Sequence, residues 1–183
     1  NGTSFRSISE DWPTQNIGEI TMDWNNKILW VGTGENNSSR SSYSGIGILK
    51  TEPNGSNWVN VGLTDSHHIG KILINPTNKD HVIVGVTGHL YSKNNNRGVY
   101  VTKDGGITWK KTLYIDDGTG IIDMAYTPNS FNIMYATAWE KDRKAWNLNE
   151  GGNSSAIYKS IDAGETWYNI SKEDSGFPVG DGV

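Results

Sequence analysis

One octapeptide turn recurs along this 183-residue chain and constrains its fold more than any other feature. Two intact copies, at residues 102–109 and 160–167, follow the pattern Ser/Thr-x-Asp-x-Gly-x-Thr-Trp. A degraded copy occupies residues 51–58, and the tail of another lies at residues 2–5. The aromatic residues that end these copies stand at positions 5, 58, 109 and 167. A regular period of about fifty residues is typical of stacked supersecondary units.

The residue types of this octapeptide suit a tight turn between two strands. Its Asp can accept hydrogen bonds from the backbone N–H groups that follow, and its Gly can adopt a positive φ. Its Thr and Trp then begin the returning strand, where β-branched and aromatic side chains pack well. Pro53 replaces this Asp in the degraded copy, which therefore lacks the capping carboxylate. We expect structural roles for Asp104, Gly106, Thr108, Trp109, Asp162, Gly164, Thr166 and Trp167.

Between consecutive copies the chain repeats one order of predicted strands. Three strands precede each octapeptide and one follows it, so each unit forms a four-stranded antiparallel blade. The fold class is thus all-β, a partial β-propeller of about three blades within one segment, residues 1–183. The strands predicted before the octapeptides are 17–23, 27–33 and 45–51, then 69–75, 82–87 and 98–102, then 121–127, 133–139 and 156–160. The predicted blades are 17–63, 64–114 and 115–171, flanked by the tail of a preceding blade at 1–16 and the lead-in to the next at 172–183.

The connections between predicted strands differ in length in a regular way. The links from first to second strand are short turns, whereas the links from second to third strand are long and variable, at residues 34–44, 88–97 and 140–155. Because antiparallel strands reverse direction, the long loops share one face of the propeller and the octapeptides share the other. Variable loops on a rigid scaffold are where binding residues usually lie.

The composition excludes several classes of partner. With 16 basic and 20 acidic residues, the net charge is -4, so we expect neither nucleic acid nor an anionic membrane surface as a partner. No apolar stretch approaches the roughly 18 residues of a spanning helix, which argues against membrane insertion. Because the chain has no cysteine, it contains neither disulfides nor thiolate metal sites.

The octapeptide and five further motifs resemble a known family. They are similar to the Asp-box (BNR-repeat) β-propellers of the bacterial sortilin N-terminal, VPS10-like type, often described as glycosyl hydrolases with BNR repeats. The resemblance implies an extracytoplasmic (secreted, cell-surface or periplasmic) ring of seven to ten blades, whose remaining blades would be partners of this segment. The further motifs are residues 31–36 (VGTGEN), 68–70 (HIG), 88–90 (GHL), 97–100 (RGVY) and 139–146 (WEKDRKAW).

The long loops carry the residues suited to binding. In the third loop, tryptophans beside an arginine can stack on a sugar ring or a peptide side chain while charged groups orient it. The alternative is that these tryptophans only pack the loop onto the propeller face. The predicted ligand-binding residues are Arg40, Tyr43, His68, His89, Arg97, Trp139, Arg143 and Trp146.

The neighbouring histidines His67 and His68 invite a metal hypothesis. Adjacent residues in an extended chain point to opposite sides, so these two are poor joint ligands, and no His-Glu-x-x-His motif is present. We therefore expect no metal site and no cofactor.

Three functions remain open from the sequence. The first is a propeller that binds a glycan or a peptide or protein ligand on its long-loop face. The alternative is a glycoside hydrolase, which needs a carboxylate pair; Glu35 and Glu140 are candidates, with a partner outside this chain. The third is a segment without a site of its own. We favour binding, because no acid pair and no nucleophile with its base can be assembled from the residues present.

Overall fold

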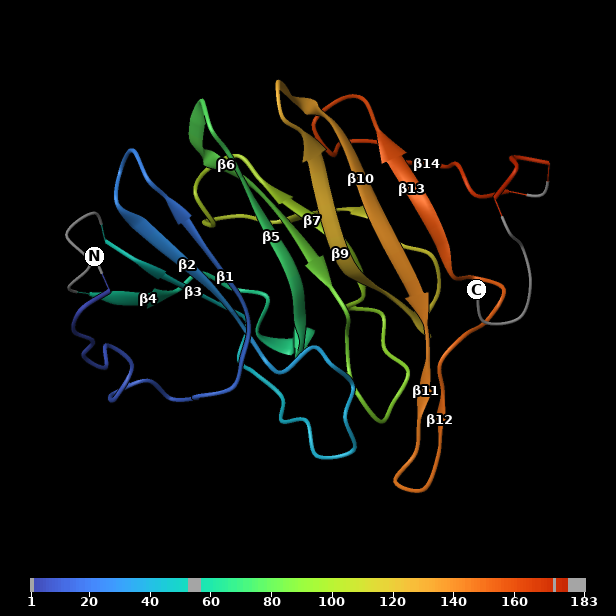
Figure 1. Ribbon diagram of the computed structural model, residues 1–183, viewed down its shortest axis with the longest axis horizontal. Helices are drawn as coiled ribbons and strands as arrows, with labels where there is room; N and C mark the ends of the chain where they lie inside the picture. Colours follow the sequence, from blue (N-terminus) through green and yellow to red (C-terminus); the bar gives the residue numbers. More distant parts are fainter. Residues whose placement is uncertain (1, 53–56, 173, 178–183) are drawn as a thin grey trace.

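The protein forms three four-stranded antiparallel sheets, which lie side by side as blades of a partial β-propeller (Figure 1). The computed structural model describes residues 2–52, 57–172 and 174–177. The first sheet contains β1 (Ile17–Asp23), β2 (Ile28–Thr33), β3 (Ile48–Thr51) and β4 (Trp58–Asn60). The second contains β5 (Ile69–Asn75), β6 (Asn78–Val86), β7 (Gly98–Thr102) and β8 (Lys110–Leu113). The third contains β9 (Thr119–Thr127), β10 (Ser130–Glu140), β13 (Ala156–Ser160) and β14 (Tyr168–Asn169).

The strands follow one another in space as they do in the sequence. Each sheet begins with an inner strand, and β5 contacts both other inner strands, β1 and β9. The single helical turn in the described part of the chain is a 3-10 turn, η1 (Thr64–Ser66), at the start of the second blade. Across these described residues, no helix has the length and apolar character needed to cross a membrane.

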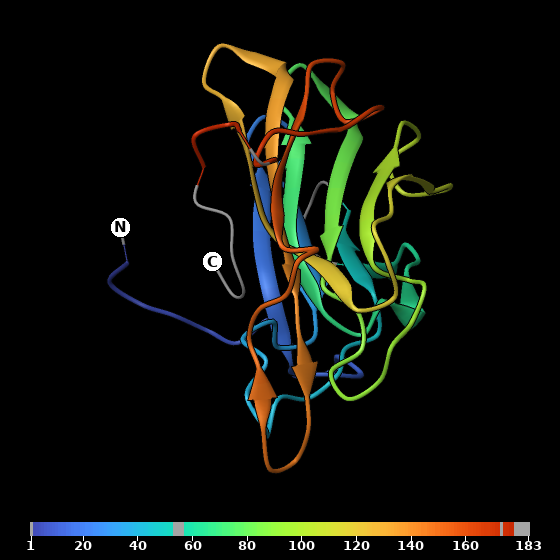
Figure 2. The same cartoon turned by 90° about the vertical axis from the view of Figure 1, so that its right-hand side faces the viewer.

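The predicted order of three strands and then a fourth is confirmed in all three sheets, and residues 53–56 of the degraded octapeptide lie outside the described residues. Third strand β3 begins later than expected, because Gly47 at φ 95° interrupts the extended backbone. The loop predicted at 140–155 contains a two-stranded hairpin, β11 (Asp142–Arg143) and β12 (Leu148–Asn149), which the sequence analysis missed. This hairpin projects beyond the other loops (Figure 2).

The segment before β1 contacts the first blade through an aromatic pair. Residues 2–16 contain no strand, and Phe5 is exposed. Trp12 packs edge-on against Trp58 with ring centroids 4.2 Å apart, which attaches this segment to the first blade. The assignment of residues 1–16 to a preceding blade and of 172–183 to the next stays a prediction. Pro53 and residues 178–183 lie outside the described residues.

The two intact octapeptides adopt the same hydrogen-bonded turn. In the first, the Asp104 carboxylate accepts the backbone N–H of Thr108 at 2.9 Å and its hydroxyl at 2.6 Å. In the second, Asp162 accepts the corresponding groups of Thr166 at 2.9 and 2.5 Å. Hydrogen bonds to Thr108 hold the pKa of Asp104 down at about 2, because they favour the ionised carboxylate.

Each octapeptide also contacts the preceding blade. Trp109 donates its indole N–H to the carbonyl of Val61 at 2.7 Å, and Trp167 donates to the Thr112 hydroxyl at 3.3 Å. A Cβ on Gly164 would lie 2.7 Å from Cδ1 of Ile83, so the turn packs closely on the second sheet. The two intact octapeptides therefore stabilise the packing of neighbouring blades.

The hydrophobic core is divided into two seams between sheets. The first and second sheets share a cluster around Trp30, Ile69 and Val84, and the second and third share one around Ile83 and Met134. The two faces of β6 supply alternate residues to the two seams, as the two-residue period of a strand requires. The side chains of the second sheet are thus buried on both faces.

We predict that Gly164→Ala lowers the free energy of unfolding by about 2–4 kcal/mol, because the methyl group meets the seam and φ is 84°. Gly176→Ala is the control, because Gly176 has φ 80° with no atom within 4 Å of an added Cβ. We expect a smaller loss from this control, about 1–2 kcal/mol, from backbone strain alone. Urea unfolding of both variants measures the difference, and equal losses would contradict close packing at Gly164.

Candidate functional site

The long loops gather at one end of the blades, opposite the octapeptides (Figures 1 and 2). Loop one (34–47) joins β2 to β3, loop two (87–97) joins β6 to β7, and loop three (141–155) joins β10 to β13. The connection that contains η1 emerges at the same end. We call this end the long-loop face. All the ligand-binding residues predicted from the sequence lie on or next to these loops.

A cleft of about 330 Å³ opens between loop one and loop two. Tyr43 and Tyr91 stand at it with 65% and 49% of their surface exposed. The Tyr91 hydroxyl donates to the backbone carbonyl of Arg40, which ties the two loops together. We call this hollow the tyrosine cleft; its lining residues are Ser42, Tyr43, Ser44, His67, His68, His89, Leu90, Tyr91 and Ser92.

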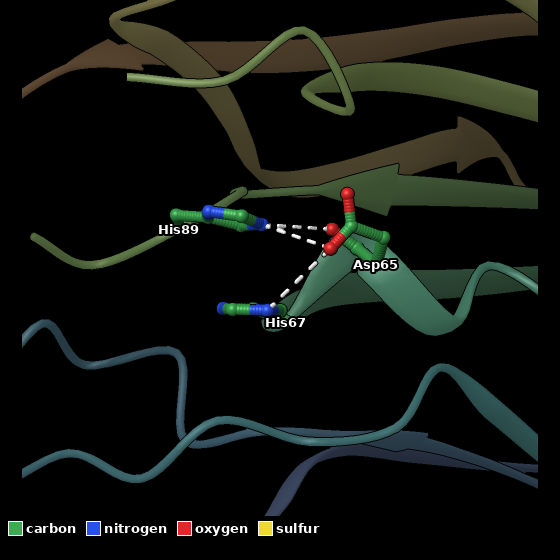
Figure 3. Close-up of side chains that lie close together, drawn as sticks. All are labelled: Asp65, His67 and His89. Carbon is green, nitrogen blue, oxygen red and sulfur yellow. Dashed lines mark hydrogen bonds and ion pairs between the residues drawn. The ribbon is translucent and has the colours of Figure 1, made fainter. Parts of the chain in front are cut away.

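Two imidazole rings border the tyrosine cleft beside a carboxylate (Figure 3). The rings of His67 and His89 stack with centroids 3.6 Å apart and planes 14° apart. Asp65 Oδ1 lies 3.7 Å from Nε2 of His67 and 3.4 Å from Nε2 of His89. Burial, and then the neighbouring His89, lower the pKa of His67, so this ring is neutral at pH 7.

A second, more polar hollow of about 430 Å³ lies between loop one and the hairpin β11–β12. It holds three residues predicted from the sequence, Arg40, Arg143 and Trp146, and the Trp146 ring is 85% exposed. Two guanidinium groups beside an exposed indole can bind a carboxylate and stack on a flat group. We call it the arginine hollow. Because loop one lines both hollows, they adjoin on the long-loop face.

Arg97 is buried and supports loop two, which lines the tyrosine cleft. Its side chain is only 2% exposed, and its guanidinium donates to the carbonyls of Thr87 at 2.6 Å, His89 at 2.8 Å and Ser92 at 3.1 Å. These three donors are directed to loop two, and the predicted ligand contact of Arg97 stays a prediction. A guanidinium is the side chain best able to bind several carbonyls at once.

His68 and Lys141 are buried near Arg97. His68 is 2% exposed at the wall of the tyrosine cleft, and burial followed by the Lys141 charge lowers its pKa to about 4. Lys141 is 6% exposed, contacts the Ser38 hydroxyl, and lies 5.0 Å above the Trp139 ring. Burial, and then the charge of Arg97, lower the Lys141 pKa to about 7. His68 is therefore neutral at pH 7, and Lys141 is near half protonation.

The two candidate catalytic acids are bonded to their own loops. Glu140 accepts the backbone N–H of Ser154 at 2.9 Å, and Glu35 accepts the backbone N–H of Tyr43 at 3.3 Å. Trp139 donates its indole N–H to the Glu150 carbonyl at 2.6 Å, at the base of loop three. These three residues thus shape the loops, and neither acid is shown bonded to the other.

Sequence reasoning missed the contribution of Asp65 and the pairing of His67 with His89. Asp65 and His67 lie in the connection before β5. His89 lies in loop two, 22 positions after His67. No short motif joins them, and only the shared face of their loops signalled that they could meet. Lys141 was also missed, because a lysine in a charged loop usually lies in solvent.

We predict that Lys141→Met stabilises the protein at pH 6 by about 1–3 kcal/mol, because a buried ammonium is removed. The folded-state pKa of Lys141 is about 7, below its unfolded value of about 10.4. The unfolded wild type therefore binds more protons between these values, so its free energy of unfolding rises with pH there and the advantage of the variant narrows toward pH 10. Urea unfolding from pH 6 to 10 tests this, with the half-exposed Lys144→Met as control. A constant difference between Lys141→Met and wild type across this range would contradict it.

Comparison with solved structures agrees with the propeller architecture. The chain is similar to the GH74 xyloglucanase from Xanthomonas campestris, with TM-score 0.59 and 18% identity over 91% of this chain and 24% of that one. It is similar to the GH74 enzyme of Niastella koreensis, with TM-score 0.59 and 21% identity over 84% of this chain and 21% of that one. It is also similar to YCF48 from Cyanidioschyzon merolae, with TM-score 0.54 and 19% identity over 90% of this chain and 42% of that one.

The chain thus spans less than half the length of each of these proteins. No protein-family model matches the sequence, and a search of curated proteins gives no match. At these identities the likeness establishes the fold alone, and the fold is a β-propeller.

Proposed function

We propose that this protein binds a glycan or a peptide on its long-loop face and that the tyrosine cleft is the centre of the site. The observation that carries the proposal is the exposure of Tyr43 and Tyr91 at a cleft that serines and histidines also line. A tyrosine offers a large rigid surface with one polar end, and it loses little conformational entropy when it binds a ligand. Two such rings from different loops suit a ligand that is itself part apolar and part polar.

The arginine hollow extends this surface. Loop one contributes residues 39–41 to the arginine hollow and residues 42–44 to the tyrosine cleft. A ligand longer than one sugar ring or one amino acid can therefore reach from the tyrosines to Arg40, Arg143 and Trp146. Guanidinium groups there would favour ligands that carry a carboxylate.

Binding without hydrolysis fits the carboxylates of the long-loop face better than catalysis does. A glycoside hydrolase needs two carboxyl groups roughly 5 to 9.5 Å apart on either side of the scissile bond. Glu35 and Glu140 each accept a backbone N–H of their own loop, and no hydrogen bond pairs either of them with a second carboxylate in the described part of the chain. Hydrolysis with a carboxylate outside this chain is the alternative, and the fold shared with GH74 enzymes is its only support here.

The proposal includes a family type and a location. The matching hydrogen bonds of Asp104 and Asp162 support the interpretation of the octapeptides as structural Asp-boxes, of the kind found in sortilin-like BNR-repeat propellers. In such a protein the present chain would be one segment of a larger ring. We expect that ring to be secreted or exposed at the cell surface, where glycans and peptides are accessible.

We predict that the full chain retains ligands from an array of polysaccharide-derived oligosaccharides or from an array of random peptides. For the strongest ligand found, Tyr43→Ala and Tyr91→Ala should each weaken binding at least about tenfold, because stacking area is lost. Tyr168→Ala is the matched control, since Tyr168 is similarly exposed but lies on β14. Isothermal titration calorimetry with the chosen oligosaccharide or peptide measures all four proteins.

Two kinds of result would overturn the proposal. The first is a binding result: no binding on either array, or full binding by the Tyr43→Ala, Tyr91→Ala double variant. The other is release of reducing sugar from a bound oligosaccharide that stops in a folded Glu140→Gln or Glu35→Gln variant, which would establish hydrolysis instead.

A further inference from the structure

Three potential metal ligands from two loops converge beside the tyrosine cleft (Figure 3). Asp65 belongs to η1 and His67 follows it, whereas His89 belongs to loop two. One ligand atom from each of the three, an oxygen of Asp65 and a ring nitrogen of each histidine, lies within 4.8 Å of the other two. The adjacent His68 is buried, and its ring centroid lies 6.3 Å from that of His67. The partner of His67 is therefore His89.

The separations between these atoms match the edges of a coordination polyhedron. Nitrogen and oxygen ligands of tetrahedral Zn²⁺ lie about 2.0–2.2 Å from the ion, which places them roughly 3.3–3.5 Å from one another. Asp65 Oδ1 is 3.4 Å from His89 Nε2 and 3.7 Å from His67 Nε2. The two rings are nearly parallel, so at least one of them must turn before all three atoms can reach one ion.

Neighbouring polar side chains contact two of the three potential ligands, Asp65 and His89. Asn96 donates its amide to Oδ2 of Asp65, which leaves Oδ1 directed at the histidines. The Ser92 hydroxyl lies 3.1 Å from Nδ1 of His89. Nε2 of His89 lies 3.1 Å from the backbone carbonyl of Asp65, which can only accept, so Nε2 carries the proton in the metal-free protein. To bind a metal, the ring must give up this hydrogen bond and carry its proton on Nδ1, where the Ser92 hydroxyl can accept it. Such partners are typical of metal-binding histidines and carboxylates.

The backbone holds His67 in a conformation that ordinary residues avoid. Its φ is 59° and its ψ is -45°, a positive-φ conformation outside the left-handed helical region, and its carbonyl accepts the Gly45 N–H at 2.7 Å. Leu63, at the start of the same 3-10 turn, also has a positive φ, 54°. Strained positions that neighbouring contacts enforce are concentrated at functional sites. Here the strain places the His67 ring against His89.

We propose that Asp65, His67 and His89 bind one divalent transition-metal ion, best matched by Zn²⁺. Two imidazoles and one carboxylate form a mixed nitrogen and oxygen set, which suits Zn²⁺ and similar ions and is a poor set for Mg²⁺ or Ca²⁺. Each ring nitrogen holds its lone pair in the plane of its ring. The planes of the two stacked rings must therefore turn away from parallel when both nitrogens bind the same ion. Both histidines are partly exposed, with 35% and 20% of their side chains accessible, so the ion can enter from solvent.

The proposed ion would lie at the wall of the tyrosine cleft. His67 and His89 both line that cleft, so the coordination positions that the protein leaves free face the same space. Three protein ligands with an open fourth position are the arrangement of zinc sites that bind a further molecule. The metal site is argued from its own geometry and does not depend on the proposed glycan or peptide binding.

Zinc titration of the full chain tests this inference, followed by calorimetry and by NMR of the histidine side chains. The chain has four histidines, so each ring can be followed separately. We expect one equivalent of Zn²⁺ to bind and to shift the ring resonances of His67 and His89. His81, which packs against Phe131 in another part of the molecule, should not shift.

Variants separate ligation from folding. His67→Asn keeps a residue that tolerates a positive φ, and together with His89→Gln it should weaken Zn²⁺ binding by about a hundredfold or more. Asp65→Asn should weaken it at least about tenfold, whereas Asp117→Asn, which removes another exposed loop acid, should not. Circular dichroism establishes that each variant is folded.

Three outcomes would overturn the inference. They are the absence of saturable Zn²⁺ binding by the wild type, undiminished binding by the folded His67→Asn, His89→Gln variant, and competition by millimolar Mg²⁺ as strong as that by Co²⁺.

Discussion

The packing of one sheet against the next is the interaction on which the rest of this structure depends. The buried apolar side chains form two seams, and each seam takes residues from two neighbouring sheets. A four-stranded sheet alone would leave the apolar side chains of both its faces in water, and such faces must be buried against another element. The blades are therefore stable through their neighbours, and the second sheet, packed on both faces, is the most completely buried of the three.

The repeated octapeptide serves these seams and leaves the opposite end free to vary. Its hydrogen bonds close a turn within one blade, and its Trp and Gly contact the preceding blade. All of this occurs at the end away from the long loops. The loops at the other end can consequently differ in length and composition without disturbing the contacts that hold the blades together.

The fold could be predicted from the sequence more completely than the site. The fifty-residue period and the alternation of apolar residues determine the strand order, because both reflect local backbone geometry that each segment carries in itself. The contact of Asp65 with His89 depends on how two loops of unrelated sequence lie across a seam, and no spacing rule describes that. Burial of Arg97 and Lys141 was unpredictable for a similar reason, since charged residues in loops usually remain in solvent.

The hydrogen bond from Tyr91 to the Arg40 carbonyl joins loops that belong to two different blades. Loop one and loop two, which form the walls of the tyrosine cleft, are therefore attached to different sheets. The distance between the walls depends on how the first sheet packs against the second. A substitution deep in that interface, around Trp30 or Ile69, would alter the spacing of the walls without touching anything that occupies the space between them. The width of the tyrosine cleft thus depends on the packing of the first two sheets beneath it.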